Sequence, residues 1–457
     1  MNRITKYLFC AFIVTAMLYF QPLKSHAQET LYHGFKCLNF KFEGHDAKIV
    51  FPEKAEEQRH WIWRTLFWGN EPPNPGLLDA TESEESKMAI NFRGNIDNCR
   101  IKFEKEKKGR VAFLGGSITF NPGWRQMTGD YLQNKFPSTE FEFINAGIPS
   151  LGSTPGAMRI SSDVLSKGTI DLLFVEAAVN DATNEIKPLQ QLRGMEGIIY
   201  QARRSNPCMD IIMMHFADQD KMADYDNDRI PEVIVQHEKA AEYYYVSSIN
   251  LAKEVNNRII NGEFTWRDDF KNVHPSPFGQ GIYFRTIKHF FDVSWKEQPA
   301  SEMRPHELPS KALDPFSYIN GHFMPVGKAK RGKGWVVSKN WKPEDKAQTR
   351  DGFVNVDVLE ASQPGAILKM KFKGTAIGVF VTAGPDAGIL EYSIDGSAFK
   401  KVDQFTKWSK NLHLPWLIML EDELTDSIHK LILRMAEEKN PASRGTACRI
   451  HKFVVND

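Results

Sequence analysis

The chain has 457 residues, of which 42% are hydrophobic and 25% are charged, and its formal net charge is +1. This composition is typical of folded globular protein and excludes a largely disordered chain. The near-neutral balance gives no general attraction to nucleic acid or acidic lipid, so a small or uncharged substrate is expected. The length predicts two or three domains.

The N-terminus has the features of a signal peptide over residues 1–27. Arg3 and Lys6 precede an apolar run from Leu8 to Phe20, and Ser25-His26-Ala27 supplies small residues at a cleavage point. An uncleaved anchor is the alternative, but the run is short for a bilayer span. We therefore expect export to the periplasm or the extracellular space, with no membrane insertion after cleavage.

Four cysteines follow the predicted signal peptide, and export permits disulfides between them. Their spacing matches no metal-binding pattern, and buried free thiols are an equally good interpretation. The four are Cys37, Cys99, Cys208 and Cys448.

Residues 28–100 have mixed, turn-rich patterning and are expected to form an N-terminal accessory region. Residues 101–297 alternate short apolar segments with helical patterns, which predicts an α/β domain with a parallel sheet covered on both faces. The predicted strands are 110–114, 140–145, 170–177 and 211–216, and the predicted helices are 124–135, 195–205 and 233–244.

Residues 298–315 are rich in Pro, Ser, Glu and Lys, a composition that is typical of a linker. Residues 316–457 then have the pattern of a β-sandwich or jelly-roll, because short strand signals are separated by turns that contain Gly and Asp. The predicted strands are 366–372, 376–382, 389–393, 416–420, 429–435 and 448–455.

Four segments of the middle region carry candidate chemistry. In the first, an apolar strand runs into Gly115-Gly116-Ser117, which places the Ser117 hydroxyl just beyond the carboxyl end of a strand. The second, from Asn145 to Thr154, is rich in small residues and can aim backbone N–H groups at an oxyanion. A phosphate loop in the first case and an ordinary connection in the second are the alternatives.

The third and fourth segments supply polar side chains. A predicted strand ends at Asn180-Asp181, so the Asn180 amide can donate a hydrogen bond at the same sheet edge, although a helix N-cap is an alternative. His274, within Val273-His274-Pro275, can take the Ser117 proton and return it to a leaving alcohol. A lone histidine beside prolines is usually a surface residue, but the four segments together favour catalysis.

Together these segments resemble the four sequence blocks of SGNH (GDSL-like) hydrolases. The resemblance implies a flavodoxin-like three-layer fold, Ser117 as nucleophile and His274 as base, without metal or organic cofactor. It also implies an oxyanion hole made by the N–H of Ser117, a second-block N–H and Asn180. The second-block donor aligns with Ser150, and Gly152 is the fallback.

The main departure from the family pattern lies beside the histidine. The family usually has an Asp three residues before it, where this chain has Lys271. Asp268 and Asp269 lie slightly upstream and reach His274 only if the loop is bulged. We select Asp269 as the third catalytic residue. The alternative is a Ser–His dyad whose imidazole is held by a backbone carbonyl.

The C-terminal region resembles the jelly-roll domains that accompany SGNH modules in multidomain carbohydrate acetylesterases. A carbohydrate-binding role and a purely structural role remain open for it. Its tryptophans can stack on sugar rings or belong to the sandwich core, and they are Trp335, Trp341, Trp408 and Trp416.

The leading functional hypothesis is an exported esterase that removes O-acetyl groups from an acetylated oligo- or polysaccharide. A lipase or thioesterase is the first alternative, although no amphipathic lid stands out between the blocks. The second alternative, motivated by Lys271, is a glycan-binding protein without activity.

Overall fold

The structure is a computed structural model that describes residues 28–32, 35–42, 45–50 and 87–457. The predicted signal peptide (1–27) and most of the predicted accessory region lie outside these residues. Within that region, β1 (Gln28–Tyr32), β2 (Phe35–Phe42) and β3 (His45–Val50) form an antiparallel sheet in the order β1-β2-β3.

The middle domain is built on a six-stranded sheet in the order β4-β9-β8-β7-β5-β6. Strands β5 to β9 are parallel, and β4 is antiparallel to β9. Read from β6, the parallel strands follow the flavodoxin-like order 2-1-3-4-5. The bounds are β4 (Ile90–Asn91), β5 (Lys108–Gly115), β6 (Glu140–Gly147), β7 (Leu172–Glu176), β8 (Asp210–Met214) and β9 (Ser247–Ile249).

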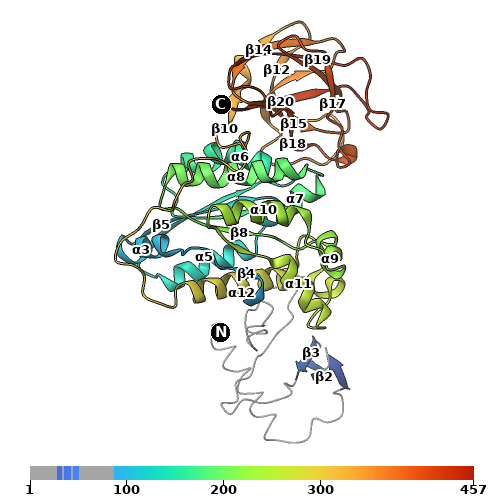
Figure 1. Cartoon of the computed structure of the whole chain (residues 1–457). Coiled ribbons are helices and arrows are strands. Elements are labelled where there is room, and N and C mark those ends of the chain that lie inside the picture. The colour runs from blue at the N-terminus through green and yellow to red at the C-terminus, as the bar shows by residue number, and fades with distance from the viewer. Residues whose placement is uncertain (1–27, 33–34, 43–44, 51–86) are drawn as a thin grey trace, which may run out of the picture.

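Helices cover both faces of this sheet, which gives three layers (Figure 1). One face packs on α3 (Asp97–Lys105), α5 (Trp124–Lys135), α11 (Leu251–Ile260) and α12 (Pro277–Ser294). The other packs on α6 (Ser153–Asp163), α8 (Pro188–Ser205) and α10 (Glu232–Tyr243). Shorter helices at the strand ends are α4 (Ser117–Phe120), α7 (Ala178–Thr183) and α9 (Gln219–Asp226). The predicted flavodoxin-like three-layer fold is confirmed.

The middle domain begins earlier than the predicted boundary at residue 101. Strand β4 pairs with β9, and α3 contributes Ile96, Cys99 and Phe103 to the core beneath the sheet. A two-residue edge strand carries no readable alternation, so the sequence pattern does not mark it as part of the α/β domain.

The predicted linker, residues 298–315, lies along the middle domain and is held there by buried acceptors. His306 Nε2 lies 2.8 Å from the buried Asp210 Oδ1. Further along, the fully buried Glu196 accepts hydrogen bonds from Leu313 N, at 2.6 Å, and from Ser317 Oγ. These hydrogen bonds hold the segment on the middle domain, and we call it, from residue 298 to Ser317, the strap.

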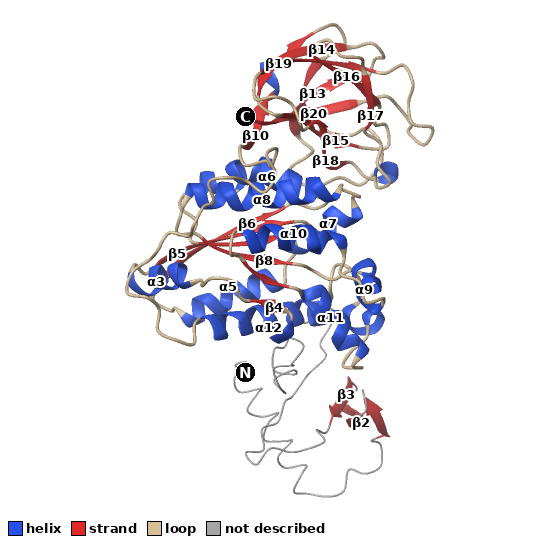
Figure 2. Ribbon diagram, in the orientation of Figure 1, coloured by secondary structure: helices blue, strands red, loops and turns tan. Residues whose placement is uncertain are grey.

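Beyond the strap, two sheets pack face to face around an apolar core, so the predicted β-sandwich is confirmed (Figure 2). The first sheet has the strand order β12-β13-β20-β15-β18, and β10 pairs with β20. Its strands are β10 (Gly321–Pro325), β12 (Val336–Trp341), β13 (Val356–Ala361), β15 (Ala376–Ala383), β18 (Leu414–Glu421) and β20 (Cys448–Asn456). The second has the order β11-β14-β19-β16-β17: β11 (Lys330–Arg331), β14 (Ile367–Lys373), β16 (Ile389–Ile394), β17 (Lys400–Asp403) and β19 (Ile428–Met435).

Strand β15 is buried on both faces, because it lies between the sandwich core and the middle domain. Side chains alternate along a strand, and Ile377, Val379 and Val381 point into the sandwich core. Ala376 and Phe380 point the other way, into the same apolar cluster as Met158 of α6. The sandwich is thus stacked on the α6–α8 layer, as Figure 1 shows.

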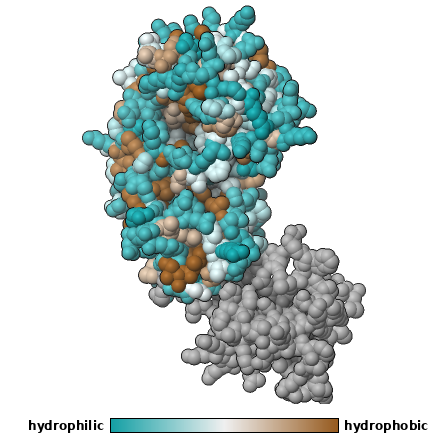
Figure 3. Space-filling view, turned by 90° about the vertical axis from the view of Figure 1, so that its right-hand side faces the viewer, coloured by the Kyte–Doolittle hydropathy of each residue, from teal (hydrophilic) through white to brown (hydrophobic). Residues whose placement is uncertain are grey.

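The remaining surface is consistent with an ordinary globular protein. Hydrophilic residues dominate the face shown in Figure 3. Among the described residues, no helix has both the length and the apolar character needed to cross a bilayer.

Cys99, Cys208 and Cys448 are free thiols, and two of them are buried, which favours the free-thiol interpretation for these three.

Arg193 of α8 ties the three parts together, which predicts a stability effect. Its buried guanidinium pairs with Asp314 of the strap at 2.8 Å and with Glu423 of the sandwich at 2.7 Å. Arg193→Ala leaves the partly buried Asp314 and the exposed Glu423 without their cation, so we expect a loss of about 2 kcal/mol in the free energy of unfolding, most of it from the pair with Asp314. The midpoint of urea unfolding measures it.

Lys339→Ala is the matched control, because it breaks the exposed pair with Asp357, and such pairs contribute at most about 1 kcal/mol. Equal midpoints for the two variants would contradict the role of Arg193.

Candidate active site

Ser117 and His274 meet at the carboxyl edge of the sheet. Ser117 is the first residue of α4, directly after β5, and His274 lies in the loop that leads to α12. The Ser117 Oγ and His274 Nε2 atoms are 2.7 Å apart, although 157 residues separate them in the chain. Strand β5 stands between β6 and β7, where the strand order reverses and open α/β sheets bind their ligands.

The loop that carries His274 is bulged. A π-helical turn runs from Trp266 to Phe270, and Lys271 follows with φ of 82°. The backbone N–H of His274 then donates to Asn272 Oδ1 at 2.8 Å. These bonds fix the approach of His274 to Ser117.

Asp269 holds the same loop from within. Its Oδ2 accepts hydrogen bonds from Thr265 N at 2.8 Å and from Thr265 Oγ1 at 3.1 Å. Its main-chain carbonyl accepts a hydrogen bond from Ser276 Oγ at 2.5 Å. The Asp269 carboxylate is therefore bound to Thr265, and its role as the carboxylate that orients His274 stays a prediction.

The electrostatic surroundings of His274 favour the neutral imidazole. Partial burial of the ring lowers its pKa below the ordinary value, and the positive charge of Arg350 lowers it further. Arg350 belongs to the loop between β12 and β13 of the sandwich. A neutral imidazole is the form that can accept the Ser117 proton, so both effects support a general base.

The candidate oxyanion donors follow β5, β6 and β7, at the edge of the sheet that carries Ser117. The N–H of Ser117 opens α4 and is among the amides that a helix leaves without an internal acceptor. Ser150 has φ of 74° in the turn before α6, and its carbonyl accepts a hydrogen bond from Asn184 Nδ2 at 2.8 Å. Gly152 is the N-cap residue of α6, with an extended backbone.

Asn180 packs directly against the backbone beside the nucleophile. A Cβ atom on Gly116 would lie 1.9 Å from Asn180 Oδ1, so only glycine leaves room for this side chain. The structure thus brings Asn180 to the strand end that carries Ser117, as the sequence blocks predict.

The buried Asp181 carboxylate binds the start of α6, next to the candidate oxyanion donors Ser150 and Gly152. Asp181 Oδ1 accepts a hydrogen bond from Ser153 N at 2.8 Å, and its Oδ2 lies 2.9 Å from His237 Nε2. Both side chains are fully buried. A Cβ on Gly152 would lie 2.0 Å from Asp181 Oδ1, which explains the glycine at that position.

Three of these neighbours were not selected from the sequence. His237 lies within an apolar helix and has no motif around it, while Asp181 was interpreted only as part of an Asn-Asp pair. Arg350 comes from the other domain, so no local pattern connects it with His274.

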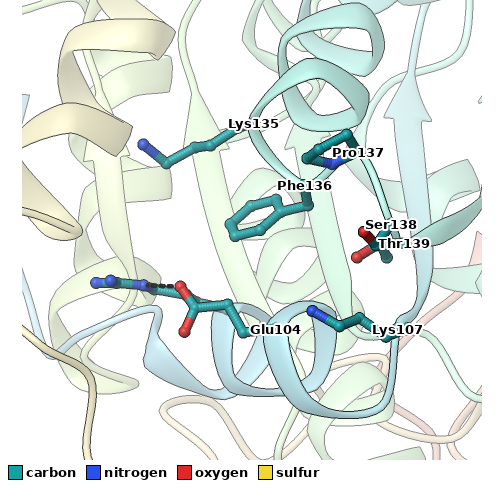
Figure 4. Close-up of a pocket in the computed structure, with 8 residues that line it drawn as sticks. Glu104, Lys107, Lys135, Phe136, Pro137, Ser138 and Thr139 are labelled. Carbon is teal, nitrogen blue, oxygen red and sulfur yellow. Dashed lines mark hydrogen bonds and ion pairs between the residues drawn. The ribbon is translucent and has the colours of Figure 1, made fainter.

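A separate polar hollow lies at the opposite edge of the sheet (Figure 4). It has a volume of about 370 Å³ and is lined by residues just before β5 and β6, among them Lys107 and Thr139. Within it, Arg100 Nε donates to Glu104 Oε1 at 2.7 Å. This hollow is remote from Ser117.

Comparison with known proteins agrees with this geometry. Residues 113–282 match the model of the GDSL-like Lipase/Acylhydrolase family, and this segment holds all four sequence blocks. No curated protein matches the chain significantly.

Among solved structures, the chain is similar to a two-domain esterase (CEX) active on acetylated mannans, with 20% identity and a TM-score of 0.67. The same esterase co-crystallised with mannopentaose gives 19% identity and a TM-score of 0.65. Each match covers 81% of this chain and 98% of that chain, so the likeness extends over both domains of the fold.

The charge of Arg350 makes the titration of His274 a direct test of the site. Because that charge lowers the pKa of His274, Arg350→Ala is expected to raise the pH at which the imidazole becomes protonated. NMR titration of the His274 ring measures this without requiring turnover. Arg331→Ala, an exposed arginine on β11, is the control and leaves the midpoint in place. A midpoint that stays or falls in Arg350→Ala would contradict the assigned proximity.

Proposed function

We propose, starting from a GDSL-like SGNH hydrolase domain over residues 113–282, that the protein is a serine ester hydrolase that removes O-acetyl groups from a complex carbohydrate. The observation that carries the proposal is the 2.7 Å contact between Ser117 Oγ and His274 Nε2 at the switch point of the sheet. In line with the features of residues 1–27, the proposal includes export to the periplasm or the extracellular space.

The proposed reaction begins with attack by Ser117. Ser117 Oγ attacks the acetyl carbonyl carbon while His274 Nε2 takes the hydroxyl proton. The negative charge on the carbonyl oxygen is stabilised by the N–H of Ser117, the N–H of Ser150 or Gly152, and the Asn180 amide. The sugar hydroxyl then leaves with the proton from His274, which forms an acetyl-enzyme on Ser117.

The second half of the reaction repeats these steps with water. His274 takes a proton from water, the resulting hydroxide attacks the acetyl-enzyme, and Ser117 regains its proton as acetate leaves. All these steps use the side chains and backbone of this chain.

The carbohydrate part of the proposal has two supports. The structure that resembles this chain over both domains is an esterase active on acetylated mannans. In this chain the sandwich also stands against the catalytic domain and brings Arg350 close to His274. A long-chain lipase and an inactive glycan-binding protein are the alternatives that the experiment must separate.

Removing either member of the Ser117–His274 pair is expected to abolish ester hydrolysis. Ser117→Ala and His274→Ala each lower kcat by at least about a thousandfold, because nucleophile and base act as a unit. Release of 4-nitrophenol from its acetate and octanoate measures this, and acetate is the preferred ester. Ser166→Ala, a serine remote from the catalytic edge, retains activity.

A preference for octanoate would support the lipase alternative. Wild-type rates equal to those of Ser117→Ala on both esters and on acetylated glycans would contradict catalysis altogether.

Asp269→Asn tests the predicted third residue, because asparagine keeps an oxygen acceptor for Thr265 and removes only the charge. If Asp269 orients His274, kcat falls by about ten-thousandfold while the stability of the fold is preserved. Asp268→Asn changes an exposed neighbour and is the matched control. A loss below about tenfold would leave Ser117 and His274 as a dyad, with Asp269 holding the loop.

A further inference from the structure

Trp408 differs from the other tryptophans that the sequence singles out in the sandwich. Trp335 and Trp341 are buried, and Trp416 packs against the sandwich core. Trp408 is 44% exposed, in the turn between β17 and β18. Part of the indole of Trp408 therefore faces solvent, where an aromatic ring can offer its face to a ligand.

The turn that carries Trp408 is rigid. Ser409 is fully buried, and its Oγ accepts a hydrogen bond from Thr406 N at 3.0 Å. The N–H of Trp408 donates to Thr406 Oγ1 at 3.2 Å. The ammonium group of Lys407 lies 5.4 Å from the centre of the indole ring. The indole is therefore presented to solvent on a fixed platform.

An exposed ion pair places this turn near the oxyanion side of the active site. Lys407 Nζ pairs with Glu185 Oε1 at 2.7 Å, across the two domains. The residue before Glu185 is Asn184, whose amide binds the carbonyl of Ser150. A single ion pair thus links the Trp408 turn to Glu185, and the neighbouring Asn184 binds the loop that carries Ser150.

A second sandwich loop is fastened to the first and carries Arg350. Gln348 N donates to Asn411 O at 2.9 Å, and His413 N donates to Gln348 O at 2.8 Å. Arg350 Nε is buried and has no acceptor among the described residues. The charge of Arg350 also reaches His274. A buried donor without an acceptor, beside a catalytic base, is positioned for an oxygen atom of a ligand.

We infer that the two sandwich loops, 345–350 and 404–413, form a carbohydrate subsite that completes the active site, with Trp408 stacking on a pyranose ring and Arg350 donating to sugar oxygen atoms. The inference rests on the proposed function and names which part of the substrate each domain binds. The middle domain holds the acetyl group, and the sandwich holds the sugar chain that carries it. Stacking on an indole suits a pyranose because its C–H face is apolar, while its hydroxyls accept from a guanidinium.

The packing between the domains makes such a shared site possible. Ala376 and Phe380 of β15 share one apolar cluster with Met158 of α6, so the sandwich that carries both loops packs on the middle domain. Gln190 of α8 adds a hydrogen bond to Asp422 of the sandwich at 3.0 Å. A subsite divided between two domains requires this rigidity, because a mobile sandwich would lose the alignment.

The test compares a substrate that has a sugar chain with one that lacks it. The purified full chain, Trp408→Ala and Arg350→Ala are assayed on acetylated mannan and xylan oligosaccharides and on 4-nitrophenyl acetate. The ratio of kcat/KM on oligosaccharide to kcat/KM on 4-nitrophenyl acetate is expected to fall about tenfold in each variant. Phe399→Ala removes an exposed aromatic from the other sheet and keeps the ratio.

Unchanged ratios in Trp408→Ala and Arg350→Ala, with wild-type circular dichroism, would overturn the subsite while leaving the proposed function intact. If the wild type cleaves neither substrate, the proposed function fails, and calorimetric binding of the same oligosaccharides tests the subsite alone. Weaker binding by both variants than by Phe399→Ala then supports it. Equal binding by all of them, or no binding by the wild type, overturns it.

Discussion

The apolar contact between β15 and the α6–α8 layer is the constraint on which the rest of the structure depends. A strand in a sandwich usually has one buried and one solvated face, but all of β15 is buried. Phe380 and Ala376 on its second face join the cluster of Met158 and Tyr318 beneath the sandwich. The two domains therefore share one apolar cluster, and this contact sets the position of the sandwich on the middle domain.

Buried polar groups then select one arrangement within that apolar contact. Apolar packing is not directional, whereas Glu196 and Arg193 each require several partners in fixed positions. Glu196 is satisfied by Tyr244 of the middle domain together with Leu313 and Ser317 of the strap. Arg193 adds carboxylates from the strap and the sandwich. Glu196 thus fixes the strap on the middle domain, and a shifted sandwich would separate the buried Arg193 from Glu423, so Arg193 favours one register between the domains.

How much of the site is predictable from sequence follows from where its residues come from. Ser117 and Asn180 each follow an apolar strand, and parallel strands deliver their carboxyl ends to one edge, so their meeting follows from the pattern alone. His274 was found only because it accompanies those motifs. Arg350 and Lys407 approach the site through packing between domains, which leaves no periodic signal. The polar composition of residues 298–315 predicts a linker but gives no sign that Glu196 and Asp210 bind its backbone and side chains.

The position of Arg350 has a consequence for catalysis once the sugar subsite is accepted. A neighbouring cation keeps His274 neutral, which helps it to accept a proton, but it opposes the imidazolium that forms when the proton arrives. The oxyanion that develops on the other side of Ser117 lowers that opposition, because its negative charge forms together with the imidazolium. A sugar hydroxyl bound to the guanidinium leaves the charge of Arg350 in place, so the subsite would contribute alignment and not neutralisation. Binding of the sugar chain by the sandwich would then favour attack by Ser117 as well as affinity, because the acetyl group is held in line with the nucleophile.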